Sequence, residues 1–409
     1  MILIEFLFFL LGTIFLSISI AGYGTFLSNK IQSNFFLDIF LGFTIISFII
    51  TTYHFFFKIN VIINLLVLIF GSIFFFKKRK FSSILTVVNK SNILNLLIIL
   101  LFIPLFISQK YHEDFGYYHL PYALAFLEEK IVFGFANIDK SFVYNSIWLN
   151  IYSFFFLKDD NFNFLTFPSF LLFLSFTMFS IDKILKEKNI KISDYYITFV
   201  LFYFLLKFTR ISEFGVDFPA NVFSILGILF FIKFYETTED FEKKSFFYLN
   251  FVFSIFAILI KLSAIPIIIL PIYLYIFNLK QLKFFIFNLN FLIIYFLFTV
   301  FLIQQFIYTG CFLFPTNLTC FNVSWFNPDY INLSKDLELT NKSYSIARDI
   351  HSPEKYLENF TWFNFWIKRN FIEIMEHLLT MLTPLLIFLF ILKKKKTNFL
   401  KFSQKKNLF

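Results

Sequence analysis

Long apolar runs with very few charges recur along the whole of this chain. Most runs hold about 15 to 23 residues, and about 20 residues of α-helix cross the hydrocarbon core of a bilayer. A chain of 409 residues that is 58% hydrophobic, with a mean hydropathy of +0.75, has too much apolar surface for a soluble domain. The pattern therefore predicts an all-α integral membrane protein that crosses the bilayer many times.

The runs predict about eleven spans in one polytopic membrane domain, residues 1–409. The spans cover residues 2–24, 35–57, 60–76, 91–109, 161–181, 194–208, 218–235, 247–260, 263–278, 284–308 and 374–392. Residues 1–90 hold the N-terminal helices, 91–308 the core, 309–373 a long loop, and 374–409 the last helix with a basic tail. The first run has no basic segment before it, so we expect it to stay as a span.

Two basic clusters, residues 77–80 and 393–396, set the predicted orientation. Lys and Arg concentrate on the cytoplasmic side of membrane proteins, so both clusters are cytoplasmic. The N-terminus then lies outside the inner (plasma) membrane and the C-terminus inside it. The same arrangement places the two long loops, 109–160 and 309–373, on the extracytoplasmic side. The net charge of +10 collects in short loops and forms no basic face, which argues against nucleic acid as a partner.

A polar stretch, residues 112–121, follows the apolar run 91–109 and so lies at a membrane surface. Glu113 and Asp114 can bind a divalent cation through oxygen ligands or act as a general base. The alternative is a solvated loop start. Gly116 favours a tight turn that would prevent one continuous helix, and residues 120–129 predict an amphipathic surface helix. A histidine-based zinc site would need three or four ligands, more than this stretch supplies.

Other ionisable residues lie close to the predicted outer surface. In the turn 209–217, Asp217 can complete a metal-binding or acceptor-binding site with Asp114. Arg210 in the same turn either has a functional role or forms an interfacial salt bridge with Glu213. Lys261 lies in an apolar stretch just before Pro266, which predicts a broken or re-entrant helix. Its side chain either binds a phosphate or is simply solvated at a hairpin apex.

The second long loop contains the two cysteines of the chain, Cys311 and Cys320. They predict a local disulfide, because an extracytoplasmic loop lies in an oxidising compartment. Further along this loop, Arg348 suits a phosphate ligand, with a solvated surface arginine as the alternative. The chain has no Walker A loop, G-x-G-x-x-G, G-x-S-x-G or H-E-x-x-H motif, so ATP-driven transport, serine hydrolysis and zinc proteolysis have no support.

Seven short motifs occur in a characteristic order. They are D-F-G-Y-Y-H at 114–119, G-F-A-N at 134–137, N-S-I-W at 145–148, D-F-P-A at 217–220, K-L-S-A-I-P at 261–266, G-C-F-L-F-P at 310–315 and A-R at 347–348. Together they resemble a bacterial group within the GT-C superfamily of polytopic membrane glycosyltransferases. Each motif alone is weak, whereas the ordered set spans residues 111–366 and is more specific.

The resemblance implies a GT-C-like fold and an enzyme that takes a hexose or pentose from a polyprenyl-phosphate carrier. The acceptor would be a lipid or glycan at the extracytoplasmic face. Asp114 would be the catalytic base or a metal ligand, with Asp217 as its partner and Glu113 and His119 beside it. The resemblance also implies that three basic side chains bind the donor phosphate: Lys261, Arg210 and Arg348. It allows a divalent cation, Mg or Mn, held by Asp114 and Asp217.

Two other functions are compatible with the same residues. A transporter or flippase of a glycolipid or polysaccharide precursor would use them as a translocation path, but such proteins place polar residues at mid-depth in several spans and often show internal repeats. The sequence shows few of the former and none of the latter. An envelope polysaccharide polymerase or ligase would rely on outer-loop arginines more than on acids.

Overall fold

The computed structural model describes residues 2–28, 34–78, 97–98, 100–103, 114–157, 165–186, 191–206, 214–283, 285–343, 357–360, 362–376, 378–379, 382 and 386. These residues form helices and connecting turns, with one isolated β-bridge between Cys311 and Cys320 and no strand. The all-α class is therefore confirmed for the described part of the chain. The chain divides into two compact units, residues 1–196 with 208–327 and residues 197–207 with 328–409.

Seven helices of the described residues are long and apolar enough to cross a membrane. They are α1 (Ile2–Ser28), α2 (Phe35–His54), α3 (Val61–Lys78), α8 (Phe167–Lys186), α10 (Asp217–Glu236), α11 (Asp240–Ile260) and α14 (Leu289–Thr309). Each coincides with a predicted apolar run. The chain thus has the helices of a multi-pass membrane protein.

For the remaining predicted spans, the structure either differs from the prediction or describes only a few of the residues. The run 194–208 corresponds to α9 (Ile192–Leu206), whose 15 residues are fewer than the roughly 20 that cross a bilayer. The run 263–278 begins as a 3-10 helix, η6 (Leu262–Ile268), and continues as α12 (Ile269–Phe277). The predicted break is at Lys261, where α11 ends and η6 begins. A separate bend of 93° lies between this stretch and the helical turns that follow it. The runs 91–109 and 374–392 lie mostly outside the described residues.

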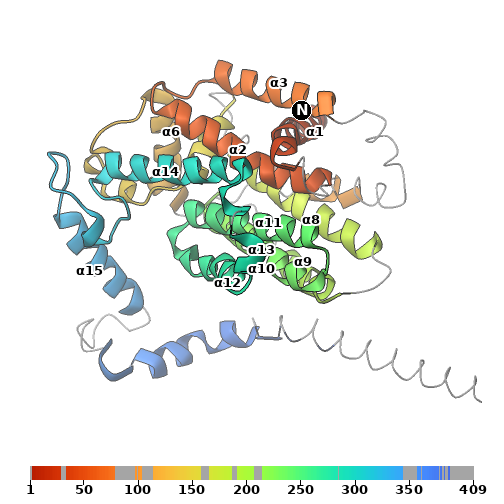
Figure 1. The fold of residues 1–409 in the computed structure, drawn as a ribbon. Helices are drawn as coiled ribbons and strands as arrows, with labels where there is room; N and C mark the ends of the chain where they lie inside the picture. Colours follow the sequence, from red (N-terminus) through yellow and green to blue (C-terminus); the bar gives the residue numbers. More distant parts are fainter. Residues whose placement is uncertain are drawn as a thin grey trace, which may run out of the picture. The chain divides into compact units, whose positions relative to one another are not determined.

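The N-terminal helices pack unusually closely. Helix α1 lies against both α2 and α3, as Figure 1 shows for the red and orange segments. A Cβ atom built on Gly22 of α1 would lie 1.8 Å from the carbonyl oxygen of Gly71 in α3. Small residues allow helix backbones to approach one another in membrane proteins. The close contact between α1 and α3 therefore depends on glycine at these positions.

The first long loop is folded rather than extended. A π-helical turn, η1 (Phe115–His119), runs directly into α6 (Leu120–Glu128), so the predicted break at Gly116 is wrong. The predicted helix after it is present, and its buried face carries Tyr122 and Phe126. A short helix, α7 (Ile147–Phe154), follows, and all eight of its residues are buried.

The second unit contains α15 (Asp329–Ser343), a helix of low apolarity, and a further helical stretch at residues 362–376. Helix α15 begins with Asp329 in its first turn, where an acidic side chain interacts favourably with the helix dipole. The functional residues described below all belong to the first unit.

Candidate functional site

Segments far apart in the sequence meet around one cavity of about 540 Å³ in the first unit. Its lining includes four residues that the sequence singled out. Asp114 and His119 come from the η1 segment, Asp217 begins α10, and Lys261 follows the last residue of α11. The structure thus places two carboxylates, a histidine and a lysine at a single hollow.

Lys261 is paired with Asp217 across the cavity wall by a salt bridge. The extended backbone at Lys261, with φ −148° and ψ 118°, ends α11 and directs the following residues along the cavity. The side chains of Lys261 and Asp217 are 42% and 72% exposed, so water screens the pair and its contribution is at most about 1 kcal/mol. A weak, accessible pair of this kind can exchange its partner for a ligand.

Tyr118 also lines the cavity. Burial raises the pKa of Tyr118 above its usual value, and the neighbouring carboxylates of Asp114 and Asp217 raise it further. The phenol therefore keeps its proton at neutral pH and can donate a hydrogen bond to a ligand. Tyr117, its sequence neighbour, is 78% exposed, so only one residue of this pair faces the site.

Aromatic packing holds the residues that precede Asp217. Phe214 stacks on Tyr152 of α7 with ring centroids 3.8 Å apart. The Tyr152 hydroxyl donates to the Gly215 carbonyl at 2.8 Å and lies 3.2 Å from the Gly215 amide. His119 is almost fully buried against the same Phe214 ring, at 5.9 Å between centroids. These contacts position the start of α10 against η1, so that Asp217 faces the cavity.

The motif N-S-I-W forms part of the cavity wall. The Ser146 hydroxyl donates to the Ile260 carbonyl at 2.6 Å and accepts from the Trp148 amide at 3.2 Å, so it caps α7 and ties it to the residue before Lys261. Asn145 lines the cavity beside it. The sequence alone did not indicate a site role for Asn145 or Ser146, although both belong to the N-S-I-W motif.

The motif G-F-A-N links the first long loop to α14 and to the second long loop. The Gly134 amide donates to the Ile307 carbonyl at 2.8 Å, and the Asn137 side chain donates to the Trp325 carbonyl at 2.9 Å. Gly134 has φ +69°, and a Cβ there would lie 2.8 Å from the Cβ of Trp325. A side chain at this position would meet both backbone strain and a steric clash. The loops therefore depend on this glycine for their contact.

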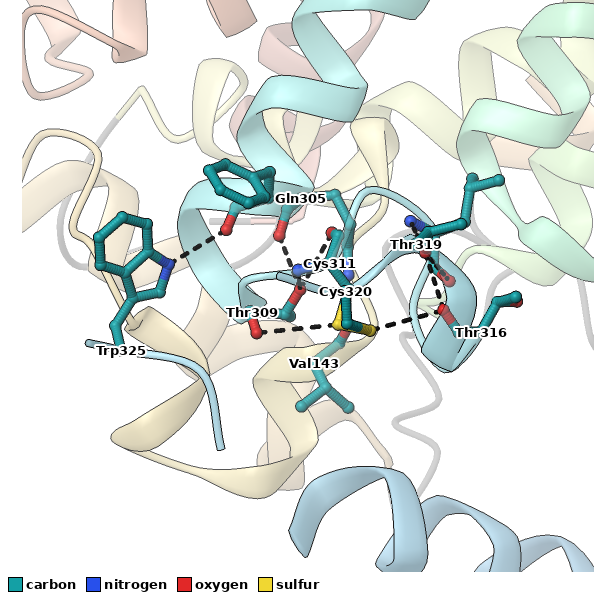
Figure 2. Close-up of a disulfide and its surroundings, with 10 residues drawn as sticks. Val143, Gln305, Thr309, Cys311, Thr316, Thr319, Cys320 and Trp325 are labelled. Carbon is teal, nitrogen blue, oxygen red and sulfur yellow. Dashed lines mark hydrogen bonds between the residues drawn. A yellow bond between two sulfur atoms is a disulfide. The ribbon is translucent and has the colours of Figure 1, made fainter. Parts of the chain in front are cut away.

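A disulfide between Cys311 and Cys320 closes the loop after α14. Figure 2 shows the two sulfur atoms between Thr309 and Thr316, and the Thr309 hydroxyl accepts from the Cys311 amide at 3.1 Å. The enclosed segment supplies Phe314 and Pro315 to the cavity lining. The crosslink thus shapes one wall of the site.

We expect the double substitution Cys311→Ala and Cys320→Ala to lower the free energy of unfolding by about 2–3 kcal/mol, because closing a loop of this length restricts the unfolded chain. The midpoint of thermal unfolding in detergent measures the change. A reducing agent should lower the midpoint of the wild type and leave the double variant unaffected. An unchanged midpoint in the variant would show that the crosslink does not stabilise the loop.

Three residues of the predicted site, Glu113, Arg210 and Arg348, lie outside the described residues. Within the described part of the chain, no group of three His, Cys, Asp or Glu side chains could hold a metal ion. Asp114 and Asp217 supply two carboxylates to the cavity, the number that Mg²⁺ often takes from a protein when substrate phosphate completes its coordination.

The comparison with known proteins gives a match over nearly the whole chain. Residues 1–404 match the family described as a domain of unknown function, DUF8201. The chain belongs to this family. No curated protein and no solved structure matches it. The family description names no activity.

Proposed function

We propose that this protein is a membrane glycosyltransferase of the GT-C type. It transfers a sugar from a polyprenyl-phosphate donor to an acceptor hydroxyl on a lipid or glycan. The observation that carries the proposal is the presence of Asp114 and Lys261 on one cavity of about 540 Å³. That volume is in the range of small-molecule binding sites. Transfer from a sugar phosphate needs a base for the acceptor hydroxyl and a cationic group for the phosphate that leaves.

In the proposed reaction, Asp114 accepts the proton of the acceptor hydroxyl as its oxygen attacks the anomeric carbon of the sugar. The bond between that carbon and the phosphate oxygen breaks, and polyprenyl phosphate leaves with the bonding electrons. Lys261 stabilises the negative charge that develops on the leaving phosphate. Asp217 holds Lys261 before the donor binds, as their salt bridge suggests.

Tyr118 and His119 have supporting roles in this scheme. The protonated Tyr118 phenol donates a hydrogen bond to donor or acceptor oxygen, and the buried His119 keeps η1 packed on Phe214. A divalent cation, if used, would be held by Asp114 and Asp217 and would neutralise the phosphate.

We further propose about eleven spans and a GT-C fold. The positive-inside rule then places the N-terminus and the cavity on the extracytoplasmic side of the plasma membrane, and the C-terminus in the cytoplasm.

The proposal is tested with purified protein in liposomes that contain a polyprenyl-phosphate sugar labelled in the sugar, together with lipid and glycan acceptors. We expect label to move onto an acceptor and polyprenyl phosphate to appear in equal amount. Lys261→Met should lower this transfer by about 10²-fold or more, because charge stabilisation of the leaving group is lost.

Two other outcomes separate the rival functions. Label that crosses the bilayer while still attached to its carrier would identify a flippase and contradict the transferase. Label that accumulates in chains of repeating units would identify a polymerase or ligase. Lys191→Met is a matched control, because Lys191 precedes α9 and is not among the cavity-lining residues.

A further inference from the structure

Asn145 is a buried polar residue that also reaches the cavity. It is 7% exposed, yet it is part of the cavity lining. Buried polar side chains are normally kept because their hydrogen bonds are satisfied by protein or by a ligand. The way in which this amide is held therefore indicates what it can bind.

Two hydrogen bonds fix the orientation of the Asn145 amide. The Tyr122 hydroxyl donates to its oxygen at 3.2 Å, and its nitrogen donates to the Gln304 side-chain oxygen at 3.3 Å. Gln304 is itself held by a bond to the Tyr308 hydroxyl at 3.0 Å. Tyr122, Gln304 and Tyr308 are all buried, so the network is rigid and dry.

The amide still has capacity after these bonds are made. A primary amide has two N–H donors and two acceptor lone pairs, and the network uses one of each. The remaining donor and lone pair match a hydroxyl group, which both donates and accepts. A group that is already oriented binds such a hydroxyl with little loss of side-chain entropy.

The neighbouring residue places this amide next to the phosphate end of the cavity. Ser146 is bonded to the carbonyl of Ile260, and Lys261 follows immediately. If Lys261 binds the donor phosphate, the attached sugar lies in the same cavity that Asn145 lines. Lys261 is the stronger phosphate ligand of the two, because its charge strengthens the hydrogen bond and a neutral amide lacks that charge.

We propose that Asn145 determines the sugar specificity of the site by binding one hydroxyl of the transferred sugar. The inference rests on the proposed function, and it names the recognised group: a ring or exocyclic hydroxyl of a hexose or pentose joined to phosphate. A site built to bind a hydroxyl rejects an analogue that lacks it, because the buried amide is then left unpaired.

The test uses farnesyl-phosphate-linked hexoses and pentoses and their monodeoxy analogues, with dissociation constants measured by calorimetry and without acceptor. For the sugar that binds the wild type most tightly, we expect one deoxy position to weaken binding by about 10- to 100-fold. Asn145→Ala should bind the parent sugar as weakly as the wild type binds that analogue, and should no longer distinguish the two.

Asn150→Ala is the matched control, because Asn150 contacts the same Gln304 at 3.5 Å and is fully buried but does not line the cavity. It should keep the deoxy discrimination. If Asn145→Ala fails to fold, Asn145→Asp keeps the shape and the acceptor for Tyr122 and removes the amide donors.

The outcomes distinguish this inference from the proposed function. Transfer without discrimination of any deoxy analogue, or discrimination that survives in the Asn145 variants, overturns the specificity role alone. Discriminating binding without transfer to any acceptor overturns the transferase alone. A wild type that binds none of these sugars overturns both.

Discussion

Asp114→Asn is expected to lower kcat for sugar transfer by about 10² to 10⁴, with donor binding close to that of the wild type. Asparagine has nearly the same shape as aspartate but does not accept the proton of the acceptor hydroxyl. The loss should therefore appear in kcat rather than in the dissociation constant of the donor. Initial rates with labelled donor, together with donor binding by calorimetry, measure the two effects separately.

Asp139→Asn provides the control within the same long loop. Asp139 accepts a hydrogen bond from the Ser141 amide at 2.7 Å and is not among the residues that line the cavity. Hydrogen bonds from Ser141 lower the pKa of Asp139, and asparagine caps a helical turn almost as well. This variant should retain activity. If Asp114→Asn is as active as Asp139→Asn, the assignment of the catalytic base is wrong.

Gly22→Ala is expected to destabilise the N-terminal helices by about 3 kcal/mol or more. Overpacking of a core commonly costs about 1–3 kcal/mol, and here the obstacle is backbone rather than a side chain. The new Cβ would lie 1.8 Å from the carbonyl oxygen of Gly71 and 2.8 Å from its carbonyl carbon. Relief requires α1 and α3 to separate, which also disturbs the contact of α1 with α2. The yield of monodisperse protein and the thermal midpoint measure the effect.

Gly12→Ala tests whether the loss comes from the close helix contact or from removing any glycine of α1. The added Cβ would lie 3.3 Å from the ring tip of Phe167, a side-chain atom that can move slightly. Alanine also favours helix over glycine by about 0.5–1 kcal/mol. We expect this variant to be close to the wild type in stability. Equal behaviour of the two variants would contradict the proposed tight packing of α1 on α3.

Much of the helical architecture could be predicted from the apolar runs, because each run is a local property of the chain. Within the described part of the chain, long helices lie at seven of these runs. The predictions were poorest where short helices pack inside the protein. Gly116 is a helix breaker by propensity, but a π-helical turn includes it, and α7 is buried in a loop that the sequence showed only as a connection.

The candidate site was only partly visible in the sequence. Asp114, Asp217 and Lys261 stood out because ionisable side chains are costly near a membrane, and the structure places all three at one cavity. Tyr118 and Asn145 were missed as site residues because tyrosine and asparagine are common at membrane surfaces and in loops. Their importance follows from burial and from partners that composition does not reveal.

The sequence by itself determined that this chain forms apolar helices long enough to cross a membrane. Lipid offers no partners for backbone groups, so each such segment must satisfy its own hydrogen bonds. That constraint acts over about 20 residues and can be read locally. Only the tertiary structure decided which polar residues meet. Lys261 and Asp217 are 44 residues apart in the chain, and Asn145 and Gln304 are 159 apart. Such contacts depend on how whole helices pack, and so the cavity belongs to the folded molecule rather than to any one segment.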